Sequence, residues 1–296
     1  MKKSFVFWVE EYFYNPTFFQ KILSFLLLPL SWIYCFATWL RYVAAKEEDF
    51  GVQIVSVGNL NVGGSGKTPL VTALASRRDN AAIVLRGYGR QSKGLRVVKN
   101  KQEILEDVQV SGDEAMTYAK KLPNAIVIVS ENRKLGIKKA LEYGVDVIFL
   151  DDAYSKHDVK KLDLLIDVQS ENSACLPSGP FRERLYKTKK ALVLRDGIDF
   201  KRIVTLRDAR EKMSLVTAIA RPQRLDAYLP AVVGKNYFED HHAFTKQELE
   251  AILQRDGADS ILVTMKDYVK MESFNLPLSL LDLELDVQES VYSAIS

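Results

Sequence analysis

The chain has 296 residues, of which 47% are hydrophobic and 27% charged, a composition typical of about two globular domains beside an N-terminal apolar segment. The formal net charge of +3 is too small to indicate a nucleic-acid-binding protein, although it suits an anionic membrane surface. Cys35 lies in an apolar run and Cys175 stands alone, so we expect neither a disulfide framework nor a zinc site, and a reducing cytoplasm is the natural compartment.

The N-terminal region contains a long apolar run. Residues 22–40 carry no charged side chain and are bracketed by Lys21 and Arg41. The run is long enough to cross a bilayer. With the rest of the chain in the cytoplasm, a crossing would place Lys2, Lys3 and Lys21 outside, which the positive-inside tendency disfavours.

Three interpretations of this run remain open. Pro29 interrupts it, Trp and Tyr side chains recur in it, and residues 5–19 form an amphipathic lead-in. These features favour helices that lie in the membrane interface over a spanning helix, and a buried helix of a soluble domain is the third alternative. No small-residue cleavage site follows the run, which argues against a signal peptide.

A glycine-rich loop follows a predicted strand. Strand-like residues 52–57 precede the sequence GGSGKTP at 63–69, and residues 70–75 are compatible with a helix. In a P-loop, backbone N–H groups surround phosphate oxygens, the lysine neutralises the β- and γ-phosphates, and the threonine contacts Mg²⁺. The sequence therefore predicts a nucleoside triphosphate site, with a plain glycine-rich turn as the alternative. The predicted binding residues are Asn61, which replaces the first glycine of the full pattern, Val62, Gly63, Gly64, Ser65, Gly66, Lys67, Thr68 and Pro69.

Continuous apolar runs alternate with helical patterns after the P-loop. Runs without polar alternation are typical of strands buried on both faces. We therefore expect an α/β fold, a P-loop NTPase-like parallel sheet with helices on both faces. The predicted strands are residues 82–85, 125–129, 145–150 and 164–168.

A loop-rich junction at residues 171–180 separates this sheet from a second, smaller α/β pattern. Strands of the second pattern are predicted at residues 191–194, 215–219, 231–233 and 261–264. The predicted division is membrane-associating helices in residues 1–50, a P-loop domain in 51–168 and a second lobe in 169–296, with a hinge near 169–190. A cleft between the lobes is the expected ligand site.

The predicted strand at 145–150 ends in two carboxylates, Asp151 and Asp152. A buried strand that ends in aspartate beside a P-loop is the Walker B arrangement, in which the carboxylate orders Mg²⁺ or its waters. We assign the metal to Thr68 and Asp151, and we expect Asp152 to orient water or substrate. The alternative is a pair of aspartates at the start of an ordinary loop.

Two further clusters carry groups that can handle a proton. Asp113 and Glu114 open a predicted helix that runs to Lys121. A carboxylate there can accept the proton of a hydroxyl nucleophile, although acidic residues in a first turn usually cap the helix. His241 and His242 point different ways on a turn, which makes them a poor metal pair, and a surface turn is their default interpretation.

Together these motifs resemble one known family. They occur in order at residues 57–69, 86–90, 112–114, 150–152, 176–179, 240–242 and 264–267. From the N-terminal apolar run to about Lys270, the chain is similar to the tetraacyldisaccharide 4'-kinases, the lipid A kinases of Gram-negative bacteria. That family does not keep the first P-loop glycine, which agrees with Asn61.

The resemblance implies an activity and a location. Members of the family use ATP and Mg²⁺ to phosphorylate the 4'-hydroxyl of a tetraacylated glucosamine disaccharide 1-phosphate, a lipid A disaccharide precursor. They act at the cytoplasmic face of the bacterial inner membrane, so we expect a peripheral or monotopic protein whose apolar run leads to the lipid. The resemblance leaves protein partners open, and nucleic acid is not expected.

The resemblance also implies roles for single residues. Asp113 would be the base and His241 of the second lobe would pair with it, with His242 as the alternative. Lys67, Thr68 and Asp151 would serve ATP and Mg²⁺. The candidates for contacts with nucleotide or substrate are Tyr88, Arg86, Arg90, Glu114, Arg133 and Arg182.

The chain departs from the family pattern at two places. The family's Gly-Phe-Gln-His reads Ala-Tyr-Ser-Lys-His at residues 153–157, and its Leu-Arg-Glu-Pro reads Phe-Arg-Glu-Arg at 181–184. We interpret these changes as marks of a divergent branch, in which the role of the family's glutamine and its neighbouring histidine is in doubt. A membrane-anchored P-loop NTPase switch and a P-loop kinase of a soluble metabolite are the alternative functions.

Overall fold

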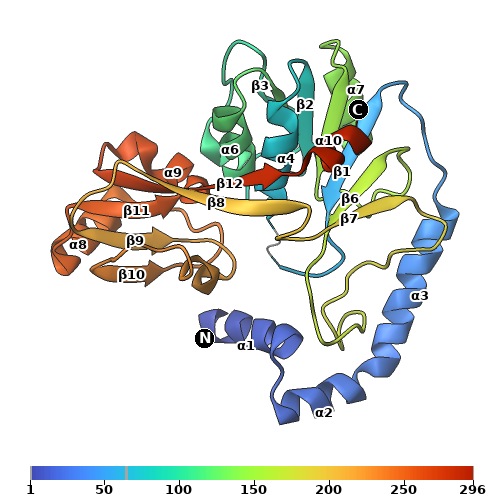
Figure 1. Ribbon diagram of the computed structural model, residues 1–296, viewed down its shortest axis with the longest axis horizontal. Coiled ribbons are helices and arrows are strands. Elements are labelled where there is room, and N and C mark those ends of the chain that lie inside the picture. The colour runs from blue at the N-terminus through green and yellow to red at the C-terminus, as the bar shows by residue number, and fades with distance from the viewer. Residues whose placement is uncertain (1, 64–65, 296) are drawn as a thin grey trace.

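The computed structural model describes residues 2–63 and 66–295, and these form two sheets with an arm of N-terminal helices (Figure 1). Within the described residues, the first sheet has seven strands in the order β3-β4-β2-β5-β1-β6-β7. Neighbouring strands are parallel except β3, which runs antiparallel to β4. The strands are β1 (Gln53–Gly58), β2 (Ala81–Leu85), β3 (Arg96–Lys99), β4 (Ile126–Val129), β5 (Val147–Asp151), β6 (Leu162–Ile166) and β7 (Ala191–Leu194).

Apolar side chains pack on both faces of this sheet, because successive residues of a strand point to opposite sides. Val55 and Val57 pack on one face with Leu70, and Ile54 packs on the other with Ile137. The helices of this part are α4 (Lys67–Ser76), α5 (Val108–Ser111), α6 (Asp113–Lys121) and α7 (Arg133–Leu141). The predicted α/β class, a parallel sheet between helices, is confirmed.

The second sheet has the order β10-β9-β11-β12-β8. The pairs are parallel except β12 with β8, which is antiparallel. Its strands are β8 (Phe200–Arg207), β9 (Met213–Thr217), β10 (Gly234–Tyr237), β11 (Ser260–Thr264) and β12 (Leu278–Val287). The helices beside it are α8 (Lys246–Asp256), α9 (Met265–Met271), and the short 3₁₀ helices η1 (Pro222–Leu225) and η2 (Glu272–Phe274).

Some strand predictions were wrong. The strand predicted at 191–194 forms as β7, but it pairs with β6 of the first sheet and not with the second. No strand forms at 231–233, since β10 begins at Gly234. The sequence analysis missed β3, β8 and β12; β8 alternates buried and exposed side chains, so it lacks the continuous apolar run that marked the other strands. The division at residue 169 stays a prediction.

The last residues of the chain return to the first lobe. β12 pairs with β11 in the second sheet, and its far end leads into α10 (Glu289–Ala294). Leu285, Val287, Val291 and Ile295 belong to the same hydrophobic core as Val55 of β1. The ribbon formed by β8 and β12 therefore runs from one lobe to the other (Figure 1).

The N-terminal helices form an arm along one side of the molecule (Figure 1). They are α1 (Lys2–Tyr14), α2 (Phe18–Leu26) and α3 (Leu28–Ala44). Helices α2 and α3 meet at an angle of 57° just before Pro29. Among the described residues, each helix by itself is too short or too polar to cross a membrane, whereas the bent pair of α2 and α3 meets the length and composition that a crossing needs.

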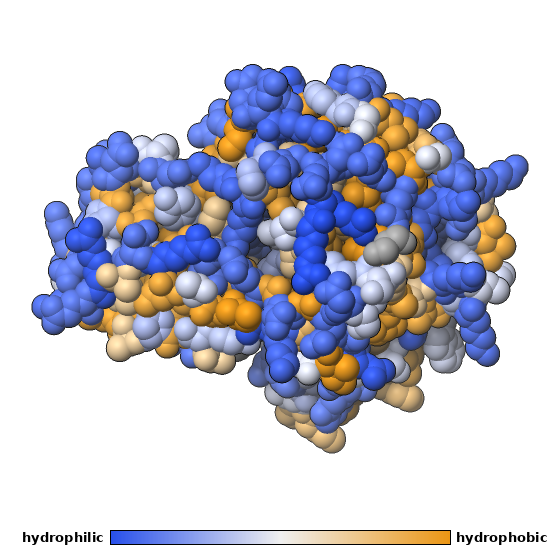
Figure 2. Space-filling model, turned by 45° about the horizontal axis from the view of Figure 1, so that its top comes forward, coloured by the Kyte–Doolittle hydropathy of each residue, from blue (hydrophilic) through white to orange (hydrophobic). Residues whose placement is uncertain are grey.

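Helices α2 and α3 expose many large apolar side chains. On the face shown in Figure 2, by contrast, hydrophilic and hydrophobic atoms are interspersed over both lobes. Exposed apolar surface of this extent marks a site of interaction, so the third alternative, a buried helix of a soluble domain, is wrong. The exposed residues are Phe18, Phe19, Ile22, Phe25, Leu26, Leu30, Trp32, Ile33, Phe36, Trp39, Leu40 and Val43.

A disulfide joins Cys35 of α3 to Cys175 in the loop after β6, which corrects the prediction that these cysteines do not pair. The prediction failed because 140 residues separate them in sequence, whereas α3 packs against this loop in the fold. Ser178 of the loop donates its backbone N–H to Ser31 Oγ at 2.8 Å, and Ser24 Oγ donates to Ser178 O at 2.8 Å. The cysteines therefore give no support to a reducing compartment.

Candidate active site

The P-loop leads from β1 into α4, as its sequence predicts. Gly66, with φ 88°, directly precedes Lys67, the first residue of α4. Lys67 Nζ donates to Asn59 Oδ1 at 3.1 Å and lies 3.6 Å from Asp152 Oδ1. The backbone N–H groups at this helix end and the lysine charge together suit an anion. The predicted binding residues Gly64 and Ser65 lie outside the described residues.

Asn61 connects the start of the P-loop by hydrogen bonds to other residues of the first lobe. Its buried side chain donates from Nδ2 to Val168 O at 2.9 Å, and its carbonyl accepts from Asn59 Nδ2 at 2.7 Å. The next residue, Val62, donates its backbone N–H to Pro180 O at 2.9 Å. A glycine could not make the side-chain bond to Val168, which gives a physical reason for asparagine at this point of the loop.

Asp152 follows β5 and adopts a left-handed conformation with φ 49°. Arg182 binds both oxygens of its carboxylate, and Arg182 Nη1 donates to Oδ2 at 3.1 Å. The partial withdrawal of this carboxylate from water raises its pKa, but the charges of Lys67 and Arg182 outweigh that effect, so the pKa of Asp152 is lowered. Asp152 is therefore an ionised carboxylate held beside the P-loop lysine.

Asp151 is buried at the end of β5, and its two oxygens differ. Oδ2 accepts a hydrogen bond from Tyr118 OH at 2.8 Å, whereas Oδ1 is buried without a hydrogen-bond partner among the described residues. Burial raises the pKa of Asp151 to about 7, and the negative charges of Glu114 and Asp152 add to the effect, although Lys67 opposes it. The charge of Lys67 therefore does not offset burial and the two neighbouring carboxylates.

The Walker B carboxylate fits a divalent cation. The unpartnered Asp151 Oδ1 offers a hard oxygen ligand, and the Thr68 side chain contacts Tyr118, which binds the same carboxylate through Oδ2. Mg²⁺ usually takes one or two protein ligands and completes its shell with water and phosphate oxygens. Among the described residues, no group of three or more His, Cys, Asp or Glu side chains is placed to hold a metal ion.

Asp113 and His241 meet across the two lobes. Asp113 is the first residue of α6 and its side chain is 3% exposed, while His241 lies in the loop after β10 with φ 62°. His241 Nδ1 lies 3.0 Å from Asp113 Oδ2 and 3.2 Å from Oδ1. The structure therefore brings together the two residues that the sequence analysis paired.

Two lysines of α9 surround the same carboxylate. Nζ of Lys266 and Nζ of Lys270 each lie 3.9 Å from Asp113 Oδ2. Burial raises the pKa of Asp113, but the hydrogen bond from His241 and the charges of Lys266 and Lys270 outweigh it and lower the pKa. The same hydrogen bond raises the pKa of His241, against the opposing effect of burial. The pair is thus biased toward a carboxylate and an imidazolium.

The alternative residue, His242, faces away from Asp113. Its Nε2 lies 3.0 Å from Glu248 Oε2, and its ring stacks on Phe238 with centroids 4.8 Å apart. His242 therefore packs within the second lobe.

The remaining substrate candidates fall into two groups. Arg90 and Arg133 are occupied, since Arg90 Nη2 donates to Gly94 O at 2.6 Å and Arg133 Nη1 donates to Ser130 O at 2.7 Å. Burial lowers the pKa of Arg133 to about 10. Arg133 also donates from Nη2 to the carbonyl of Asp151 at 3.1 Å, so it supports the end of β5.

Other candidates face the region between the lobes. Tyr88 is 63% exposed and its ring centroid lies 5.7 Å from that of His241, while Arg86 is exposed nearby on the same loop. Glu114 lies beside Asp113 and forms an ion pair with Lys266 at 3.5 Å. Tyr88 and Arg86 are thus accessible to a ligand, whereas Glu114 is paired with Lys266, and the assignment of any ligand contact stays a prediction.

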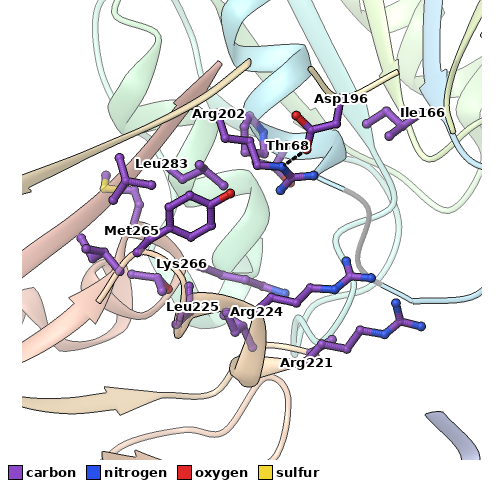
Figure 3. A pocket seen from close by; sticks show the side chains of 18 of the residues that line it. Thr68, Ile166, Asp196, Arg202, Arg221, Arg224, Leu225, Met265, Lys266 and Leu283 are labelled. Atoms are coloured by element: carbon purple, nitrogen blue, oxygen red, sulfur yellow. Dashed lines mark hydrogen bonds and ion pairs between the residues drawn. The ribbon is translucent and has the colours of Figure 1, made fainter. Parts of the chain in front are cut away.

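A cavity of about 610 Å³ lies between the two lobes beside the P-loop (Figure 3). Thr68 and Pro69 of α4 line one side, and Leu225, Met265 and Leu283 supply apolar surface on the other. Cavities of this size that combine apolar walls with a few polar groups are typical ligand sites. The predicted cleft between the lobes is present.

Three arginines of the second lobe line this cavity, and the sequence analysis missed them. Arg202 comes from β8, Arg221 precedes η1, and Arg224 lies in η1 (Figure 3). Arg221 and Arg224 follow the carboxyl end of the parallel strand β9. Because ligands of parallel sheets bind at that edge, this position was a signal that could have found them.

A family model described as tetraacyldisaccharide-1-P 4'-kinase (LpxK) matches residues 23–296. The chain belongs to this family. A tetraacyldisaccharide 4'-kinase of Aliarcobacter butzleri is 48% identical over 98% of this chain and 96% of the relative. The kinases of Helicobacter acinonychis and Campylobacter jejuni are 47% and 41% identical, over 97% and 99% of this chain and 93% and 96% of those relatives.

A solved member of the LpxK family has the same fold. The crystal structure of LpxK from Aquifex aeolicus, described as an "apo" form in complex with ATP, matches with a TM-score of 0.72 and 26% identity. The match covers 92% of this chain and 98% of the Aquifex chain. The family membership and the fold that the sequence motifs predicted are thus confirmed.

Proposed function

We propose that this protein transfers the γ-phosphate of ATP to the 4'-hydroxyl of a tetraacylated glucosamine disaccharide 1-phosphate, a step of lipid A biosynthesis. The observation that carries the proposal is the contact between Asp113 and His241, 3.0 Å apart, beside a P-loop in a chain of the LpxK family. Phosphoryl transfer to a hydroxyl needs a group that accepts its proton, and an oriented carboxylate is suited to that task.

We propose that Asp113 accepts the proton of the attacking 4'-hydroxyl. Its Oδ atoms face His241 Nδ1, and its lowered pKa keeps it unprotonated near neutral pH. His241 would hold the carboxylate in place and stabilise its charge, and Lys266 would balance the charge that gathers there during transfer. These roles are consistent with a buried carboxylate between cationic groups.

The polyphosphate would bind at the P-loop. Lys67 would neutralise the phosphate charge, and the N-terminal N–H groups of α4 would donate to phosphate oxygens. Asp152, held by its hydrogen bonds from Arg182, would orient water or substrate. In the proposed complex the adenosine part occupies the cavity between the lobes, where apolar walls are available.

We propose that Mg²⁺ is held by Thr68 and Asp151. The support is the buried, unpartnered Asp151 Oδ1 and the raised pKa of this carboxyl, both of which a cation would relieve. When bound, the ion neutralises charge on the phosphates. Tyr118 keeps the carboxylate oriented through its 2.8 Å hydrogen bond to Oδ2.

We also propose that α2 and α3 dock on the cytoplasmic face of the inner membrane and bring the cleft to its lipid substrate. The support is the exposed apolar surface of these helices. Peripheral or monotopic attachment agrees with the 57° bend between them.

One assay tests the whole proposal. The detergent-solubilised protein is incubated with ATP labelled in the γ-phosphate, Mg²⁺ and the tetraacyl disaccharide 1-phosphate, and the lipid fraction is counted. We expect label in the lipid that is lost in Lys67→Ala. Label found only as free phosphate would contradict the lipid assignment and favour an NTPase.

A further inference from the structure

Arg221 of the second lobe lies against the P-loop. A Cβ atom on Gly63 would come within 3.0 Å of Arg221 Nη2, so the guanidinium packs on the glycine backbone at the start of the loop. Arg221 itself has φ 56°, a left-handed conformation that costs free energy in a residue other than glycine. The fold therefore keeps this side chain in place at a local conformational cost.

Helix α1 holds the guanidinium from the other side. The Arg221 Cζ lies 3.6 Å from the ring centroid of Tyr14, and Arg221 Nε lies 3.4 Å from Glu10 Oε1. The Tyr14 hydroxyl donates to the carbonyl of Val62 in the P-loop. Tyr14 thus contacts both the second-lobe arginine and the P-loop, and it stacks on the guanidinium so that the Nη atoms face the loop.

The arginine side chain is only 9% exposed, and its Nε has no hydrogen-bond partner among the described residues. A buried guanidinium usually has its donors fully paired. Here it is aimed at a loop whose backbone is built to receive phosphate. Nε lies toward Glu10, whereas Nη2 lies against this loop, where a guanidinium suits a bound anion.

Two other arginines add positive charge at the same place. A Cβ on Gly66 would lie 3.5 Å from Arg202 Nη2, and Arg202 Nε is paired with Asp196 at 2.5 Å. Burial lowers the pKa of Arg224, and the neighbouring charges of Arg221 and Arg202 lower it further. Figure 3 shows the three side chains on the P-loop side of the cavity.

We propose that Arg221 is a polyphosphate-binding residue of this kinase, supplied by the second lobe and oriented over the P-loop by Tyr14 and Glu10 of α1. Its Nη groups would donate to oxygens of the β- and γ-phosphates when ATP is bound. The inference rests on the proposed function, since it assigns an anion-binding role within that site. The segment that orients Arg221 precedes residue 23, where the match to the family model begins.

The anion has two possible sources, the nucleotide and the 1-phosphate of the lipid. The position of Arg221 favours the phosphates of the nucleotide. Arg221 is next to Gly63, within the loop whose N–H groups and Lys67 surround the nucleotide phosphates. The lipid hydroxyl must instead approach Asp113, the first residue of α6.

The test compares Arg221→Ala and Arg221→Lys with wild type in two assays. The first measures the affinities for ATP, ADP and AMP without lipid. The second measures lipid phosphorylation, with the KM for ATP and the KM for lipid determined separately. Arg210→Ala, at an exposed arginine of the second lobe, is the matched control, and thermal melting verifies that each variant is folded.

We expect Arg221→Ala to weaken ATP and ADP binding by about 10- to 100-fold, because a hydrogen-bonded charge pair contributes on this scale. Affinity for AMP, which lacks the contacted phosphates, should stay as in wild type. Arg221→Lys should recover only part of the loss, since it keeps the charge without the planar fork. Tyr14→Ala should weaken ATP binding in the same direction, and Tyr14→Phe, which retains the ring, should weaken it less.

Three results would overturn the proposal. Unchanged ATP affinity in a folded Arg221→Ala protein would leave Arg221 with a packing role only. A rise confined to the KM for lipid would assign the anion to the lipid phosphate. Equal losses for ATP, ADP and AMP would indicate a general distortion of the cavity. If wild type binds ATP but does not phosphorylate the lipid, the proposed function fails, and the affinity assay still decides the role of Arg221.

Discussion

His241 Nδ1 of the second lobe lies 3.0 Å from Oδ2 of Asp113 at the start of α6 in the first lobe. The pair exists only while the two lobes are in contact, because each partner belongs to a different sheet system. The contact between the lobes therefore affects the orientation and the pKa of Asp113, the carboxylate that we propose as the base.

Asp113→Asn should lower turnover with little change in ATP affinity. The amide keeps the shape of the side chain but cannot accept the proton, and a positioned general base contributes about 10²- to 10⁴-fold to the rate. Measurement of kcat and of ATP affinity in the same preparation checks this. A parallel loss of ATP affinity would argue that Asp113 has a structural role.

The Asp113–His241 pair should make stability depend on pH. The pKa of His241 is raised above its ordinary 6.5, so its contribution is complete below about 6.5 and is lost as pH rises through the raised value. The pKa of Asp113 is lowered below 3.8, so its contribution is complete above about 3.8 and is lost as pH falls through the lowered value. The pair thus stabilises the fold most between about pH 3.8 and pH 6.5.

Thermal melting of wild type and His241→Gln over a pH series measures this effect. We expect the difference in Tm to be largest between about pH 4 and 6.5 and to shrink as the pH rises further. His242→Gln, which loses a contact to Glu248 on the other side of the turn, is the control. A difference that grows with pH above 7 would contradict the assigned ion pair.

Tyr118→Phe should destabilise the protein in the absence of Mg²⁺ and nucleotide. The change removes the donor to Asp151 Oδ2 and leaves a buried carboxylate with neither oxygen paired, at a cost of about 1–3 kcal/mol. Addition of Mg²⁺ and ATP should reduce the loss in Tm, since a cation compensates the carboxylate. Tyr143→Phe, at an exposed position just after α7, is the control, and equal stability of Tyr118→Phe and wild type would refute the prediction.

Polar substitutions in α2 and α3 should weaken membrane binding. Phe25, Trp32 and Ile33 are each at least 65% exposed, and burial of one such side chain contributes about 1.5–3 kcal/mol. The triple change to serine should therefore reduce sedimentation with anionic phospholipid vesicles by more than 100-fold in partition coefficient. Ile198→Ser, at an exposed site far along the chain, should leave sedimentation unchanged. Equal sedimentation of the triple variant would count against docking through this surface.

The sequence predicted those parts of the site that are local. The P-loop, Asp151 and Asp152 follow buried strands directly, and strand order alone brings their ends together. Only the family resemblance favoured His241 over His242, because the local sequence does not reveal the turn, where φ of His241 is 62°. That conformation directs one ring to Asp113 and the other to Glu248.

Features that depend on the packing of distant segments were not predicted. Arg221 and Tyr14 are more than two hundred residues apart, and the contact between them requires both the arm of α1 and the position of the second lobe. The disulfide between Cys35 and Cys175 was missed for the same reason. Strand β7 shows a further limit, since its apolar run identified a strand but not the sheet that it joins.

The return of the C-terminal residues to the first lobe sets an order for biosynthesis. Gln53 Nε2 of β1 donates to the carbonyl of Ile295 at 2.9 Å, and Val287 and Val291 fill the same core. Most of the second sheet precedes these residues in the chain, and Val287 itself ends β12 of that sheet. The nucleotide-binding lobe therefore cannot complete its core until these residues have been made, so its folding is coupled to the synthesis of the second sheet.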